Sequence, residues 1–142
     1  MTEEQINDMF KQGFDCGQVV LSALSSKLDI DEEMAKRVSA CFGGGMFSGQ
    51  TCGAVTGSYM AIGLKNGHCD ANTPEIKSKM IELMSDFNDK FLEKYPSTCC
   101  KEMLGHDISN PDEMEVILEK GLLTNFCPKV VLNAIEILNE II

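Results

Sequence analysis

The chain has 142 residues, which is enough for one domain with a hydrophobic core, and its 44% apolar content excludes a disordered or fibrous protein. Its formal net charge of −10 and scattered basic residues argue against a nucleic-acid-binding surface. No apolar run reaches the roughly 18 residues of a membrane span, and the first residues, MTEEQINDMF, are acidic where a secretory signal is basic. We therefore expect a cytoplasmic protein without a membrane span or a nucleic-acid partner.

Apolar residues recur at spacings of three and four along the chain, and no alternating strand pattern is present, which predicts an all-α protein. Short linkers and the lack of an internal repeat predict a single-domain helical bundle over residues 1–142, with about eight helices. In chain order, helices are expected over 2–12, 15–27, 31–42, 49–65, 74–95, a short segment after 98, 111–120 and from 128 to the end.

The segment GQTCGAVTGSYMAIGL, residues 49–64, is expected to be a central, glycine-striped helix. Gly53, Gly57 and Ala61 lie one turn apart and form a smooth strip, where a second helix can approach closely. Asn66-Gly67 predicts a left-handed C-cap at its end. Each glycine in a helix interior lowers stability by about 1 kcal/mol, so the packing between the two closely approaching helices should contribute more than this. By itself, this pattern favours a tight helix crossing without chemistry.

Seven cysteines without a CxxC pair predict that any thiol site gathers single cysteines from distant segments. Four of them fall at predicted helix starts, where free backbone N–H groups stabilise an anion and lower a thiol's pKa. Cys16 follows the cap Asp15, and Cys52 follows the cap Thr51. Cys100 begins a short helix, and Cys127 is expected to be an N-cap because Pro128 follows it. We expect these four cysteines to converge.

Two of the other thiols, Cys41 and Cys69, are expected to stay apart from that site. Cys41 is predicted to face the core with Met34 and Val38, on the apolar face of the third helix. Cys69, in the loop NGHCDAN, is expected to be exposed, with metal binding by His68 and Cys69 as the less favoured alternative. Cys99 should point away from Cys100, and His106 is interpreted as a helix-end or loop residue; the roles of Cys99 and His106 stay open.

The four cysteine motifs resemble those of the redox-active C_GCAxxG_C_C family, and they occur in the same order over nearly the whole chain. DCGQVVLSAL carries Cys16, and CGAVTGSYMAIGL carries Cys52, with FGGG before it. CKEMLG carries Cys100, and CPKVVLNAIEIL carries Cys127. Thr51 precedes Cys52 and Gly53 follows it, an order that differs from the family's name. The resemblance implies an all-helical redox protein whose four cysteines act together, with an iron–sulfur centre among the options.

Three functions fit these residues. The leading one is electron transfer through a four-cysteine metal centre, [2Fe–2S] or another, held by Cys16, Cys52, Cys100 and Cys127, with Gly53 and Gly57 letting the backbone approach the cofactor. The second is a metal-free thiol–disulfide oxidoreductase, in which Cys52 attacks and Cys100, Cys16 or Cys127 resolves. The third is a structural zinc domain that docks a partner.

Further expectations concern the reactivity of the thiols and the partners of the protein. Asp15 should oppose a thiolate at Cys16, so Cys52 is expected to have the lowest pKa of the four and to react fastest. A redox partner protein, not identified by the sequence, is expected, and a homo-oligomer is compatible with the sequence. The substrate and the reduction potential do not follow from it.

Overall fold

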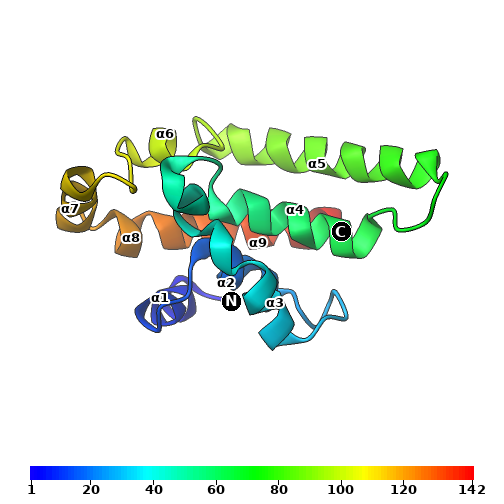
Figure 1. Cartoon of the computed structure of the whole chain (residues 1–142), viewed down its shortest axis with the longest axis horizontal. Coiled ribbons are helices and arrows are strands. Elements are labelled where there is room, and N and C mark those ends of the chain that lie inside the picture. The colour runs from blue at the N-terminus through cyan, green and yellow to red at the C-terminus, as the bar shows by residue number, and fades with distance from the viewer.

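Two helices run side by side through the middle of the molecule in the computed structural model, which describes residues 1–142 (Figure 1). These are α4 (Gly53–Asn66) and α9 (Cys127–Ile141). The long helix α5 (Pro74–Lys94) packs against both on one side. On the other side, α2 (Cys16–Ala23) packs against both, α1 (Glu3–Lys11) packs against α9, and α3 (Glu32–Val38) packs outside α2.

Three short helices close one end of the bundle: α6 (Cys100–Leu104), α7 (Pro111–Glu119) and α8 (Leu122–Asn125) (Figure 1). No strand is present, apart from a single antiparallel bridge between Thr51 and Cys99. The predicted all-α bundle is confirmed. The structure has nine α-helices where about eight were predicted, and one of them, α8, has only four residues.

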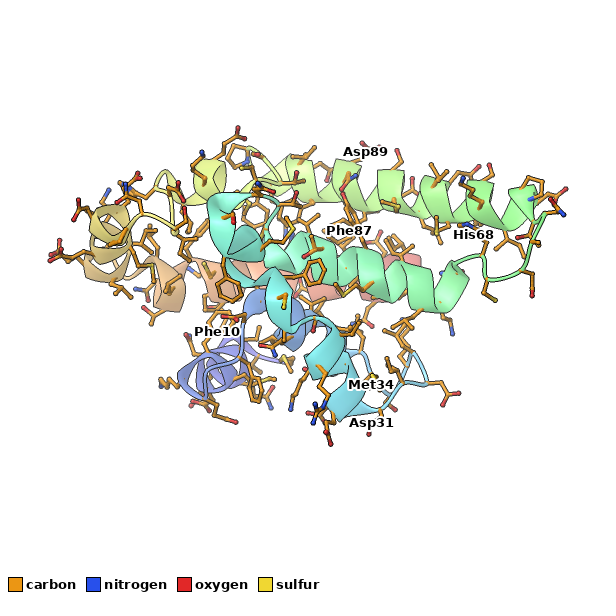
Figure 2. The ribbon with its side chains drawn as sticks, in the orientation of Figure 1. Phe10, Asp31, Met34, His68, Phe87 and Asp89 are labelled. Carbon is orange, nitrogen blue, oxygen red and sulfur yellow. The ribbon has the colours of Figure 1, made fainter.

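Local sequence signals explain several of the helix boundaries. At α1, the Thr2 hydroxyl accepts a hydrogen bond from the Gln5 N–H at 3.2 Å, and the Gln5 side chain accepts one from the Thr2 N–H at 2.9 Å. At α7, the Asn110 side chain caps the first turn and Pro111 occupies its first position. On α5, Phe87 and Phe91 are fully buried, and Phe87 meets Tyr59 of α4 edge-on at 6.2 Å between ring centroids (Figure 2).

The predicted helix over 31–42 is shorter in the structure, and its inward face is wrong. α3 ends at Val38, and residues Ala40–Phe42 form a separate 3-10 turn. The Ser39 hydroxyl donates to the Ala35 carbonyl at 2.6 Å, and Ala35 is the buried residue of α3. Met34 and Val38, four residues apart, share the exposed face of α3, because Ala35 on another face is the one that packs inward. Cys41 is exposed as well, and it lies beyond the break after Val38.

Other boundaries also differ from the prediction. α2 ends at Ala23 rather than near residue 27, and the glycine-striped helix begins at Gly53, with Cys52 itself rather than Thr51 as its N-cap. Gly67 has φ −74°, so the predicted left-handed C-cap is wrong. Cys127 is the first residue of α9 rather than its N-cap. These shifts leave all four cysteines at or next to a helix start.

The glycine strip forms the close helix crossing that the sequence predicted. A Cβ atom added at Gly57 would lie 3.0 Å from both the Cα and the carbonyl oxygen of Gly17 on α2. A Cβ atom added at Gly53 would lie 2.8 Å from the carbonyl oxygen of Phe42 and 3.1 Å from the Gly17 nitrogen. The partner glycine, Gly17, follows Cys16 directly, so this crossing also fixes the position of that thiol.

No single helix has both the length and the apolarity of a membrane span. Helix α7 and the segment Leu122–Ile141 meet these criteria only when they are taken together, and the chain bends by 55° between them.

Candidate thiol site

The structure brings four cysteines together around one cavity of about 450 Å³. The cavity lies where the α6–α8 end meets α1, α2 and the starts of α4 and α9. Its walls include Cys16, Cys52, Cys100 and Cys127, which come from four different helix starts. Cys41, Cys69 and Cys99 are not among its lining residues.

A short backbone pairing connects two of these segments. The Cys52 N–H donates to the Thr98 carbonyl at 2.7 Å, and the Cys100 N–H donates to the Gln50 carbonyl at 2.5 Å. Together with the bridge between Thr51 and Cys99, these bonds hold the segment before α4 against the segment before α6. The pairing therefore fixes Cys52 and Cys100 at one wall of the cavity.

The other two thiols are held by α2 and α9. Cys16 is the first residue of α2, and the N–H of the preceding Asp15 donates to the Gln18 side chain at 2.9 Å. The Gln18 amide donates in turn to the Lys36 carbonyl at 3.0 Å, which ties this helix start to α3. Cys127 begins the 15-residue helix α9, and both thiols are half-buried.

The Cys16 and Cys127 side chains are neighbours in the wall of the cavity. The neighbouring Cys127 side chain is the first of several causes that raise the pKa of Cys16 well above its ordinary value; burial and the nearby Asp15 carboxylate act in the same direction. The expected opposition of Asp15 to a Cys16 thiolate is confirmed. Cys16 therefore keeps its proton at neutral pH.

Cys52 and Cys100 are more deeply enclosed, and each is 8% exposed. Burial is the main cause that raises the pKa of each thiol to about 12. The N–H groups of Ala54 and Val55 act in the opposite direction at Cys52, although neither makes a capping hydrogen bond to the sulfur. The expectation that Cys52 has a lowered pKa is therefore wrong.

The remaining wall of the cavity is mostly apolar. Aromatic rings come from Phe10 on α1 (Figure 2), from Phe14, from Phe47 and from Phe126. The sequence does not mark these aromatic residues as part of a site; Phe10, for example, follows the ordinary apolar spacing of an amphipathic helix. For Phe47, the sequence does contain a signal. The glycines at 43–45 mark a tight turn, and Phe47 lies in that turn.

Phe47 is held at the cavity by an unusual backbone turn. Gly44, Gly45, Met46 and Phe47 all have positive φ, with values of 56°, 63°, 59° and 54°. This left-handed conformation costs about 1–2 kcal/mol for each non-glycine residue, so Met46 and Phe47 store backbone strain. The Phe47 side chain lines the cavity and is still 56% exposed, which places it at the rim.

The two glycines predicted to approach a cofactor occupy different positions. Gly53 lines the cavity next to the thiols. Gly57 lies one turn further along α4, packs against Gly17, and is not a lining residue. Its role in this structure is the helix crossing.

The remaining candidates lie elsewhere. Cys69 is exposed, as predicted, and His68 beside it is exposed as well (Figure 2). The half-buried Cys99 thiol donates to the Gly49 carbonyl at 3.3 Å. His106 is half-buried after α6, with its Nε2 atom 3.1 Å from the Lys120 amine.

The side chains, as they lie in the structure, do not form the predicted metal centre. No group of three or more His, Cys, Asp or Glu residues is arranged to hold a metal ion, either at the cavity or around His68 and Cys69. Four thiols share a cavity wall, but tetrahedral ligation requires all four sulfurs about 2.3 Å from one ion.

Comparison with known proteins places the chain in a family. A family model described as "Putative redox-active protein (C_GCAxxG_C_C)" matches residues 14–141, a range that contains all four cysteines of the cavity. Searches of curated proteins and of solved structures found no match. Because the family model covers most of the chain, this protein belongs to the C_GCAxxG_C_C family of redox-active proteins.

Proposed function

We propose that the protein is a dithiol–disulfide oxidoreductase in which Cys16 and Cys127 form the redox pair. The observation that carries the proposal is that these two half-buried thiols, at the starts of α2 and α9, are neighbours in the wall of one cavity. The family's redox character supports the general reaction. This pair differs from the sequence-based choice of Cys52 and Cys100. In the proposal, Cys52 and Cys100 line the buried wall of the cavity and take no part in the thiol exchange.

Cys127 is the attacking sulfur in this proposal, and Cys16 is the resolving one. The Cys127 side chain, burial and the Asp15 carboxylate all oppose a thiolate at Cys16, which makes Cys16 the poorer first nucleophile; Cys127 begins a 15-residue helix. The Cys127 thiolate attacks a substrate disulfide, forms a mixed disulfide and releases one substrate thiol. Cys16 then attacks the Cys127 sulfur, releases the second substrate thiol and leaves a Cys16–Cys127 disulfide, so that two electrons pass from the two cysteine sulfurs to the substrate disulfide.

An iron–sulfur or zinc centre with four cysteine ligands is the second candidate. Its support is that four thiols from separate helix starts face a common cavity. Binding would require the sulfurs to move closer together, since no metal-ligating group is formed. Electron transfer to a partner protein belongs to this candidate, whereas thiol exchange needs only a disulfide substrate.

Trapping the mixed disulfide tests the proposed pair. Reduced Cys16→Ser protein, treated with 2-hydroxyethyl disulfide, should accumulate a stable adduct on Cys127. The parent protein should instead yield a Cys16–Cys127 disulfide, and Cys127→Ser should yield neither product. Peptide mass spectrometry identifies each bond, and Cys41→Ser, which changes an exposed thiol away from the cavity, should behave like the parent.

Metal analysis of anaerobically purified protein separates the two candidates. The dithiol proposal expects colourless protein with iron and zinc far below one equivalent. Brown protein with stoichiometric iron, or a disulfide that maps to cysteines other than Cys16 and Cys127, would overturn it.

A further inference from the structure

The walls of the cavity limit which disulfides can reach the thiols. We propose that the substrate is a small, neutral, apolar disulfide, preferably with aromatic groups, rather than a charged disulfide or a disulfide in a folded protein. This inference rests on the proposed dithiol function and adds a substrate class to the same site.

Size is the first argument. A cavity of about 450 Å³ lies within the range of roughly 300–1,000 Å³ that is usual for small-molecule sites. Cys16 and Cys127 are half-buried in its wall rather than raised on a surface. A disulfide in a folded protein would have to bring two backbone segments into this space, whereas a small disulfide can enter whole.

The chemistry of the walls is the second argument. Rings of Phe10, Phe14, Phe47 and Phe126 surround the thiols, together with the thioether of Met103. Aromatic groups pack favourably against other rings and against methionine sulfur. A ligand with two aromatic groups therefore finds partners on several walls of the cavity.

Charge is the third argument. Lys11 is the only cationic side chain that lines the cavity; it is 74% exposed, and its amine lies 3.7 Å from the Asp8 carboxylate. Asp15 adds an anionic group beside Cys16. A substrate carboxylate would thus lose its hydration without gaining a buried cation, which is unfavourable. Glutathione disulfide and similar anionic substrates are disfavoured on this ground.

In the reaction, one disulfide bond of the substrate breaks and one disulfide bond of the protein forms. The two sulfurs of Cys16 and Cys127 are oxidised, and the two substrate sulfurs are reduced to thiols, which receive the two protons. The substrate is itself the oxidant, so no further co-reactant takes part.

Rates with three disulfides test the inference. The probes are 4,4′-dithiodipyridine (neutral and aromatic), 5,5′-dithiobis(2-nitrobenzoate) (aromatic and dianionic) and 2-hydroxyethyl disulfide (neutral and hydrophilic). Each rate of formation of the Cys16–Cys127 disulfide is divided by the rate of the same probe with N-acetylcysteine, to remove intrinsic reactivity. We expect the normalised rate of the neutral aromatic probe to exceed each of the others by about tenfold or more: burial of roughly one ring accounts for the difference from the hydrophilic probe, and the unpaired carboxylates account for the difference from the dianionic one.

Salt and a pair of variants locate the origin of this preference. At about 1 M salt the Debye length is about 3 Å, so the preference should persist there if it arises in the cavity rather than from the net charge of −10. Phe47→Asn keeps a residue that tolerates the left-handed conformation but removes the ring, and should lower the preference about threefold or more. Leu118→Asn, at an equally exposed apolar residue outside the cavity, should leave the preference unchanged.

The outcomes separate this inference from the proposed function. Formation of the Cys16–Cys127 disulfide at equal normalised rates with all three probes would overturn the substrate class and leave the dithiol function standing. The substrate class would also be overturned, with the dithiol function still standing, if high salt abolished the preference or if Phe47→Asn and Leu118→Asn altered it equally. If none of the probes produces the Cys16–Cys127 disulfide, the proposed function fails, and the substrate class fails with it.

Discussion

Burial and backbone N–H groups act on the Cys52 sulfur in opposite directions. The N–H groups of Ala54 and Val55 lower its pKa, but burial outweighs them and raises the pKa to about 12. Contributions from a helix start are usually below about 1 kcal/mol, whereas full burial can shift a pKa by up to 3–5 units. The thiol is therefore protonated in the folded protein at neutral pH.

This pKa shift predicts how the stability of the reduced protein depends on pH. The unfolded chain releases the Cys52 proton near a pH of about 8.5, and the folded protein keeps it up to about 12. Between these values the folded state binds more protons, so the free energy of unfolding falls as the pH rises; below them, the stabilising contribution is fully present. Urea unfolding with a strong reductant at several pH values above about 8.5 measures the slope.

Cys52→Ser removes this thiol and should make that slope shallower by about one proton, whatever its effect on absolute stability. Cys41→Ser, at an exposed thiol, serves as the control and should keep the parent slope. Equal slopes for parent and Cys52→Ser would contradict the effect of burial at Cys52.

Single residues also explain why part of the site could be predicted and part could not. Asp15 before Cys16 and Pro128 after Cys127 are local signals, and they locate helix starts within a residue or two. The burial of Cys52 depends on segments distant in sequence, so a helix start alone gave the wrong direction for its pKa. The prediction that Cys41 faces the core was wrong for a local reason. The apolar spacing continues past Val38, but the helix ends there.

At the scale of elements, the crossing of α2 and α4 is the contact that fixes the thiol site. Gly57→Ala would place its Cβ atom 3.0 Å from two backbone atoms of Gly17, which cannot rotate away as a side chain can. We expect this overpacking to lower the free energy of unfolding by roughly 1–3 kcal/mol, in spite of alanine's better helix propensity. Denaturant unfolding measures the difference.

Gly63→Ala provides the matched control on the same helix. A Cβ atom at Gly63 has no neighbour within 4 Å, so alanine should stabilise the protein by roughly 0.5–1 kcal/mol through helix propensity alone. Opposite signs for the two substitutions support the close crossing. A stabilising Gly57→Ala would show that the helices can separate without loss.

The sequence predicts one side of the α2–α4 crossing but not its partner. The four-residue spacing of Gly53, Gly57 and Ala61 is visible in the sequence and predicts a close approach. The partner is a single glycine, Gly17, and a single glycine has no periodicity that could identify it. The left-handed turn of Gly44–Phe47 includes Met46 and Phe47, whose residue types disfavour that conformation.

For the whole molecule, residues from two hydrophobic cores of unequal size line the cavity. The main core contains 21 buried residues from α1–α5, α9 and the segments beside them, including Ile62, Phe87 and Leu138. The second contains three, Cys100, Leu104 and Ile117, with partly buried neighbours from α7 and α8. Helix patterns predict that such cores form, but the space between them depends on how the helices meet in three dimensions, so the cavity walls could not be predicted.

This division predicts uneven hydrogen exchange across the molecule. Amides of α4 and α9 lie in the main core and should exchange slowest, at the rate of global unfolding. Amides of α6, α7 and α8 should exchange faster, because a core of three buried residues provides little free energy against local opening. Peptides covering 53–66, 100–125 and 127–141, followed by mass spectrometry in the reduced protein, measure the difference. Equal protection in all three would mean that the α6–α8 end unfolds only with the whole bundle, and that the cavity lies within one cooperative unit.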